Sequence, residues 1–134
     1  MFGGIAQFRC MERIFLISIG AVLGANLRYW VGDWAAQRWG TAFPFGTLLI
    51  NLTGSFLLGL FMTLATERYL IDPRWRTLFA VGCLGSYTTF STYTLESMSL
   101  INQGQWGAGL ANLLGSAVLG AGMALLGIYI GRLL

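Results

Sequence analysis

The stretch GCLGSYTTFSTYTLES, residues 82–97, places glycine, serine and threonine inside a segment whose surroundings are apolar enough for the middle of a membrane. No charged residue lies between Arg76 and Glu96. A continuous helix over residues 77–100 would be longer than the hydrocarbon core of a bilayer, which is about 30 Å thick. These poor helix formers therefore predict an unwound turn within GSYTT, residues 85–89, at mid-membrane depth.

The composition around this stretch is that of a membrane protein. Of 134 residues, 56% are hydrophobic and only 10% are charged. Uncharged intervals at residues 39–66, 77–95 and 97–131 are each long enough to span a bilayer, and an earlier apolar span of about residues 14–31 closes near Arg28. We therefore expect an all-α integral membrane protein, with four transmembrane helices in one domain covering residues 1–134.

Several classes of protein are disfavoured. The chain has no histidine, no lysine and no glycine loop of the kind that cradles phosphate, so an enzyme is not expected. Its arginines lie mostly at predicted membrane edges, which argues against nucleic acid as a partner. Cys10 and Cys83 are expected to be free thiols. A cleaved signal peptide is the alternative for the first span, but the apolar run continues into RYWVGDW, residues 28–34.

Two rows of polar side chains are predicted on helical faces. Thr47, Asn51 and Ser55 recur every four residues, as do Asn112 and Ser116. For any one of them, an interhelical hydrogen bond is the simpler interpretation. For Asn51 we favour a functional role, because an amide at mid-membrane is costly unless something satisfies it.

The unwound turn and the residues after it suggest ion binding. Unwound carbonyls at mid-depth must be buried, line a cavity or hold an ion, so a buried cation site is one hypothesis. Phe90, Tyr93 and Glu96 follow at intervals of three, with Thr89 beside them. Aromatic edges carry partial positive charge, so ring edges near hydroxyl and amide donors would suit a small anion, with aromatic packing as the alternative.

The segments FPFGTLLINLTGSFLLG (residues 43–59) and GCLGSYTTFSTYTLE (residues 82–96) resemble the Fluc (CrcB) family of fluoride channels. The resemblance extends over nearly the whole chain. It implies an antiparallel, dual-topology homodimer in the lipid bilayer, with two passive pathways for fluoride. It also implies a structural sodium ion (Na+) at the dimer interface, held by carbonyl groups of the broken third helix.

The resemblance also implies roles for individual residues. Gly85 and Thr88 would supply the carbonyl groups for sodium, and Asn51 would be the pore amide. Tyr93 departs from the family pattern, in which the second ring is phenylalanine. Taken with the polar rows, the predicted anion pathway comprises Asn51, Phe90, Tyr93, Thr47, Thr89, Glu96, Asn112, Ser116 and Arg28.

The sequence is also consistent with two other functions. An ion-coupled exporter of small anions would use Glu96, the one titratable group near the path, and a non-conducting assembly subunit would use the polar rows only for packing. A small multidrug-resistance transporter is disfavoured because residues 14–31 contain no carboxylate. The arginine distribution favours cytoplasmic termini, whereas the resemblance implies both orientations. A bacterial inner membrane is the expected location.

Overall fold

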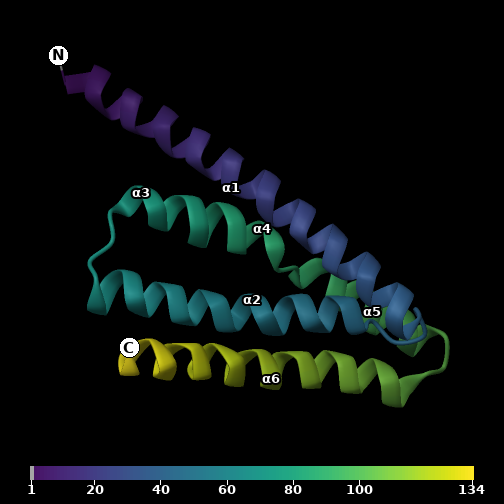
Figure 1. Cartoon of the computed structure of the whole chain (residues 1–134). Coiled ribbons are helices and arrows are strands. Elements are labelled where there is room, and N and C mark those ends of the chain that lie inside the picture. Colours follow the sequence, from purple (N-terminus) through teal and green to yellow (C-terminus); the bar gives the residue numbers. More distant parts are fainter. Residues whose placement is uncertain (1) are drawn as a thin grey trace.

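The computed structural model describes residues 2–134, with side chains from Phe8 onward. Its elements form four passes, and no strand occurs among the described residues (Figure 1). The all-helical prediction is confirmed. The elements are α1 (Phe2–Trp39), α2 (Phe45–Thr63), the π-helical η1 (Leu64–Arg68), α3 (Pro73–Arg76), the π-helical η2 (Thr77–Leu84), α4 (Gly85–Tyr87), α5 (Phe90–Asn102) and α6 (Trp106–Leu133).

Three helical stretches are long and apolar enough to cross a membrane: residues Phe8–Trp39, Phe45–Arg68 and Trp106–Leu133. The remaining pass, α3 to α5, is divided into shorter pieces. Both described chain ends lie at the same end of the molecule, so α2 and α6 run parallel to each other (Figure 1). We refer to this as the terminal end.

The first helix is longer than the apolar span predicted for it. It continues past Val31 to Trp39 because the intervening sequence contains only one glycine and no proline. The chain turns at Gly40, whose φ of +76° is a conformation that favours glycine. Arg28 therefore lies well inside the helix, about 16 Å before its end at 1.5 Å per residue, so the helix continues well beyond the apolar span predicted for it.

Glycines set the closest helix contacts. A Cβ atom on Gly24 would overlap the carbonyl oxygen of Cys83, and one on Gly127 would overlap that of Phe56. Gly20 lies equally close to the backbone of η2, and Gly131 lies against the side chain of Thr63. Gly20 with Gly24 and Gly127 with Gly131 each form a G-x-x-x-G pair, and these contacts show that both pairs serve helix packing.

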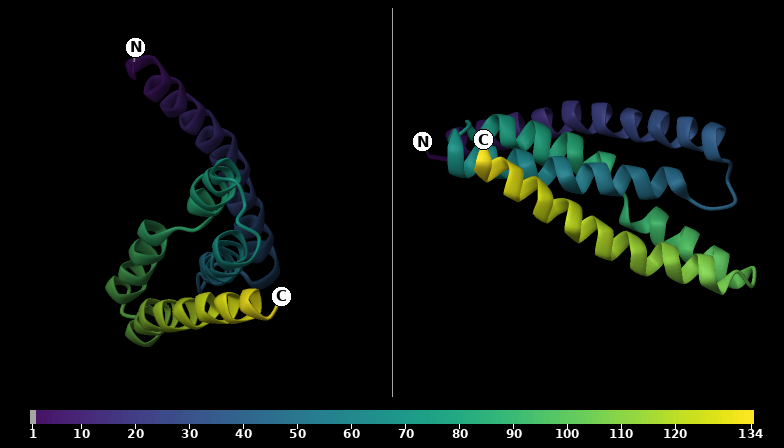
Figure 2. Two further views of the ribbon diagram at one scale, coloured as in Figure 1. Left: turned by 90° about the vertical axis from the view of Figure 1, so that its left-hand side faces the viewer. Right: turned by 60° about the horizontal axis from the view of Figure 1, so that its bottom comes forward.

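The third pass is broken within the predicted stretch. Thr88 (φ −75°, ψ 157°) and Thr89 (φ −147°, ψ 116°) are extended, and α5 begins immediately after them. On one side of the break, η2 and α4 pack against α1, whereas on the other side α5 packs against α6. Figure 2 shows α5 diverging from α1 and running beside α6. The break thus lets one pass change its packing partner midway.

We expect Gly24→Ala to lower the free energy of unfolding by about 1–3 kcal/mol, because the added methyl group overpacks a backbone contact. Thermal unfolding in detergent, followed by size-exclusion chromatography, measures this. Gly122→Ala is the control, since nothing lies within 4 Å of a Cβ atom there. Equal stability of the two variants would contradict the assigned contact.

Candidate functional site

Asn51 binds the backbone of the broken pass with both ends of its amide. Its Nδ2 donates to the carbonyl oxygen of Thr89 over 2.9 Å, and its Oδ1 accepts from the Thr89 N–H over 2.8 Å. The Thr89 hydroxyl accepts from the Thr92 N–H at 3.3 Å and donates to the Thr92 hydroxyl at 2.8 Å, which caps the start of α5. The extended turn is therefore held by hydrogen bonds to α2, through Asn51, and to the first turn of α5, through Thr92.

These bonds free two backbone carbonyl groups. In a continuous α-helix the N–H of residue i bonds to the carbonyl of residue i−4. The Thr89 N–H would then bond to Gly85 and the Thr92 N–H to Thr88, but the first donates to Asn51 and the second to the Thr89 hydroxyl. The carbonyl groups of Gly85 and Thr88 are thus deprived of their helical donors.

A cavity of about 310 Å³ lies beside the break. The ring of Phe90 is 76% exposed and meets Tyr93 edge to face, with centroids 5.3 Å apart. The positive end of α5 also lies here, since a helix leaves its first N–H groups without intrahelical partners. The lining residues are Asn51, Ser55, Thr88, Thr89, Phe90, Tyr93, Ser116, Ala117, Gly120 and Ala121.

A buried chain of hydrogen bonds joins α5 to α6. The Ser116 hydroxyl donates to Asn112 Oδ1 at 3.2 Å, and Asn112 Nδ2 donates to the Ser97 hydroxyl at 2.8 Å. Ser97 in turn donates to the carbonyl oxygen of Tyr93 over 2.7 Å. Asn112 and Ser97 are 1% and 0% exposed, so Asn112 makes an interhelical bond behind the cavity rather than lining it.

Glu96 lies further along α5, where its Oε1 accepts a hydrogen bond of 2.9 Å from the Thr47 hydroxyl. Its other oxygen, Oε2, is buried and has no hydrogen-bond partner within the described part of the chain. Both residues line a cavity of about 450 Å³ at the end opposite to the termini, together with Ser99, Gln103 and Gln105. One carboxylate oxygen is therefore left for a proton, a water molecule or an ion.

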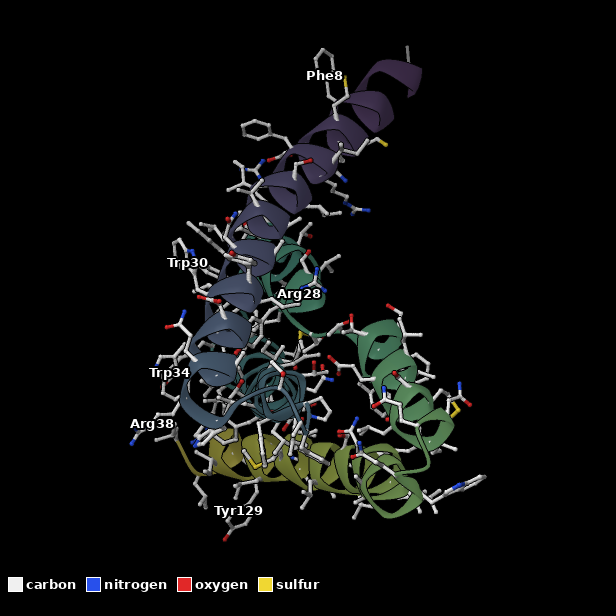
Figure 3. All side chains as sticks on the ribbon, turned by 90° about the vertical axis from the view of Figure 1, so that its right-hand side faces the viewer. Phe8, Arg28, Trp30, Trp34, Arg38 and Tyr129 are labelled. Atoms are coloured by element: carbon white, nitrogen blue, oxygen red, sulfur yellow. The ribbon has the colours of Figure 1, made fainter. Side chains whose placement is uncertain are left out.

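Arg28 faces the broken pass from α1. It is half-buried and lines a cavity of about 480 Å³ with Thr47, Thr89 and Thr92. Figure 3 shows it on the side of α1 that faces the other helices, whereas Trp30 and Trp34 point outward. Among residues with described side chains, it takes part in no ion pair. Its cationic group is thus placed close to the break.

The structure brings most of the predicted residues into one region. The cavities of Glu96 and Arg28 share Thr47, and those of Arg28 and Asn51 share Thr89. Asn112 supports this region from behind, and Gly85 contributes backbone alone. The predicted site did not include Ser97, whose hydroxyl accepts from Asn112 on α6 and donates to the Tyr93 carbonyl on α5. Ser97 follows Tyr93 by four residues, and this spacing could have placed it on the same face of α5.

Comparison with known proteins identifies relatives over most of the chain. Residues 15–128 match the family model described as CrcB-like protein, Camphor Resistance (CrcB). The fluoride-specific ion channel FluC of Koribacter versatilis is 51% identical over 112 residues, covering 79% of this chain and 89% of the relative. The FluC protein of a Synechococcus species is 50% identical over 119 residues, covering 89% and 92%, respectively. That of a Sulfurihydrogenibium species is 41% identical over 124 residues, covering 92% and 100%.

We expect Asn51→Ala to destabilise the broken pass, because both Thr89 backbone groups lose their partner at a cost of about 1–3 kcal/mol each. Hydrogen–deuterium exchange should be faster at Thr89 and Thr92 than in the unaltered protein. Asn26→Ala is the matched control, since that amide donates only to a carbonyl of its own helix. Unchanged exchange at Thr89 would rule out the assigned role.

Proposed function

Since this chain belongs to the CrcB-like family, whose relatives are named fluoride-specific ion channels, we propose that it is a passive, fluoride-selective channel. It is a multi-pass membrane protein and not an enzyme. Fluoride would leave the cytoplasm of a bacterium across the inner membrane, down its electrical gradient.

The observation that best supports this proposal is the lining of the cavity beside the break. Its lining offers amide and hydroxyl groups, aromatic edges and the positive end of α5, and none of its lining residues is charged. One of the two Asn51 amide protons binds Thr89, which leaves the second for a ligand. Such donors would replace the hydration of a small anion without holding it as tightly as a fixed cation would.

A structural sodium ion is part of the proposal. The carbonyl groups of Gly85 and Thr88 suit it, because their helical donors are engaged elsewhere and carbonyl oxygens of unwound helices bind this cation. Bound sodium would neutralise the partial charges of these oxygens and so stabilise the break.

We further propose that two copies form an antiparallel homodimer with two pathways. The 76% exposure of Phe90 supports this, since a ring edge that contacts an anion needs shielding from lipid. Accessibility of tags at both termini would test the arrangement. A single orientation in the membrane would contradict it.

An ion-coupled exporter is the second candidate. Its supporting observation is Glu96, whose Oε2 is buried without a partner in the described part of the chain. A carboxyl group in that position is able to exchange a proton during transport.

Efflux from liposomes separates the two candidates. We expect vesicles loaded with potassium fluoride to release it rapidly once valinomycin is added, without a proton or sodium gradient, while chloride-loaded vesicles release nothing. A fluoride electrode measures the fluoride release, and a chloride electrode measures the release from the chloride-loaded vesicles. Efflux that requires an imposed proton or sodium gradient would favour the exporter, and absence of efflux under all these conditions would refute fluoride transport.

Phe90→Ile tests the anion-binding cavity. We expect it to slow fluoride efflux by about tenfold, because it removes the positive ring edge while keeping apolar bulk. Phe15→Ile provides the control, since that ring is 65% exposed on α1 and does not line the cavity. An unchanged rate for Phe90→Ile would assign Phe90 to packing.

A further inference from the structure

Two rows of residues at four-residue spacing, one on α2 and η1 and one on α6, run from the cavity at the break to the terminal end. Between the break and the terminal end the row on α6 is apolar, whereas the row on α2 and η1 carries Thr63 before it reaches Glu67. The rows are Thr47, Asn51, Ser55, Gly59, Thr63 and Glu67 on α2 and η1, and Asn112, Ser116, Gly120, Ala124, Ile128 and Arg132 on α6.

Contacts between the rows keep a constant register. Ser55 Oγ lies 3.7 Å from the position of a Cβ atom on Gly120, and Gly59 lies against the backbone of Ala124. At the terminal end, Arg132 binds Glu67, 65 residues away, with Nε donating to Oε2 at 3.0 Å and Nη2 to Oε1 at 3.2 Å. Ser55–Gly120 and Gly59–Ala124 have the same separation in sequence, so the ion pair is the last contact of a parallel, in-register helix pair.

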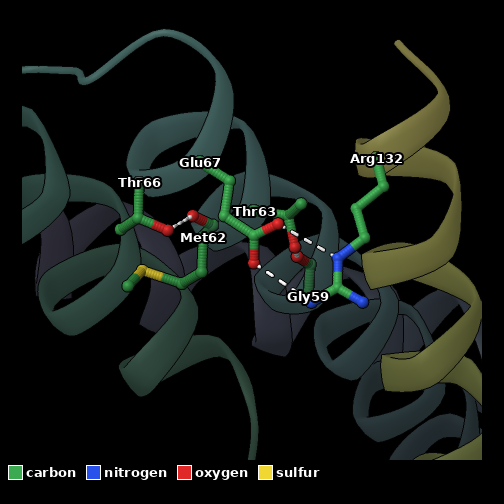
Figure 4. A network of polar contacts seen from close by, with 6 residues as sticks. All are labelled: Gly59, Met62, Thr63, Thr66, Glu67 and Arg132. Atoms are coloured by element: carbon green, nitrogen blue, oxygen red, sulfur yellow. Dashed lines mark hydrogen bonds and ion pairs between the residues drawn. The ribbon is translucent and has the colours of Figure 1, made fainter.

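A further cavity, of about 410 Å³, lies along these rows between the break and the terminal end, and we call it the terminal cavity. It shares Ser55 with the cavity at the break and reaches Glu67 and Arg132. Figure 4 shows this ion pair beside Thr63 and Thr66. The region that contains Asn51 and Phe90 is therefore continued, along the same two helices, to a charged group at the end of the molecule.

Arg132 is the cationic hydrogen-bond donor that lines the terminal cavity. The hydroxyl groups of Thr63 and Thr66 donate to carbonyl groups of their own helix, those of Gly59 at 2.9 Å and Met62 at 2.7 Å, so their protons are not free for an anion. The guanidinium group has five N–H donors, and Glu67 uses two of them. The Arg132 side chain is 62% exposed and lies at the terminal end.

We propose that the Glu67–Arg132 pair forms the terminal mouth of the fluoride pathway, in which Arg132 attracts the anion and Glu67 limits that attraction. The inference rests on the proposed function and adds to it a pair of residues that determines how fast anions enter. Because both side chains are partly exposed, their effect on anion entry is electrostatic and is screened by salt.

Fluoride efflux from liposomes at two ionic strengths tests this proposal, with a salt of an impermeant anion as the background. At about 10 mM salt we expect Glu67→Gln to speed efflux by about threefold and Arg132→Gln to slow it by about threefold. Both differences should disappear at about 1 M salt, where the screening length is about 3 Å. Arg132→Lys should restore the salt dependence, because it keeps the charge.

The Glu12–Arg74 ion pair supplies the control. It joins its partners at 2.7 Å, at the same end of the molecule and with similar exposure, but it lines a cavity between α1 and α3. Glu12→Gln and Arg74→Gln should leave efflux unchanged at both ionic strengths. An equal effect of these variants would mean that general surface charge, and not the proposed mouth, controls entry.

Two results would overturn the proposal while leaving the channel function intact. One is efflux from Glu67→Gln and Arg132→Gln that matches the unaltered protein at every salt concentration. The other is a loss that is equal at low and high salt and accompanies a lower unfolding temperature, which would make the pair a structural clamp. Failure of the unaltered protein to release fluoride would instead refute the proposed function, and this inference with it. Should Arg132→Gln not fold, the salt dependence of Glu67→Gln still decides the question.

Discussion

The two hydrogen bonds between the Asn51 amide and the Thr89 backbone are the interaction on which the site depends. An unpaired backbone group in the interior of a membrane protein costs several kcal/mol, so an extended turn persists there only if another group bonds to it. Close approach of α2 makes this possible, because Gly54 leaves room for the side chains of Tyr87 and Thr88. The break is thus stabilised from a neighbouring helix as well as by the cap that Thr89 forms within its own segment.

Three features follow from this interaction. The third pass changes its packing partner from α1 to α6, α5 gains an N-terminus within the protein, and the carbonyl groups of Gly85 and Thr88 lose their helical donors. Positive and negative ends of the backbone are thereby exposed on either side of one short turn. A helix without the break would offer neither, so the proposed fluoride and sodium sites both depend on the break.

Periodicity and composition predicted much of this arrangement. The uncharged intervals predicted three of the passes, and the weak helix formers predicted an unwound turn within residues 85–89, where Thr88 and Thr89 are extended. Asn51 and Ser116, which belong to the two rows of four-residue spacing, line the same cavity. The same spacing did not distinguish Asn112, which is buried in a hydrogen bond to Ser97, from Ser116, which lines the cavity. Identical spacing on one face says nothing of how close the neighbouring helix lies.

The sequence by itself therefore determined which segments are apolar enough to cross a membrane, where the third is weakest, and which face of each helix is polar. These properties depend on neighbours within a few residues along the chain. Only the tertiary structure decided that Asn51 bonds to Thr89, that Thr47 bonds to Glu96 and that Arg132 bonds to Glu67. These partners lie 38, 49 and 65 residues apart, and their contact depends on how closely and in which register the helices pack.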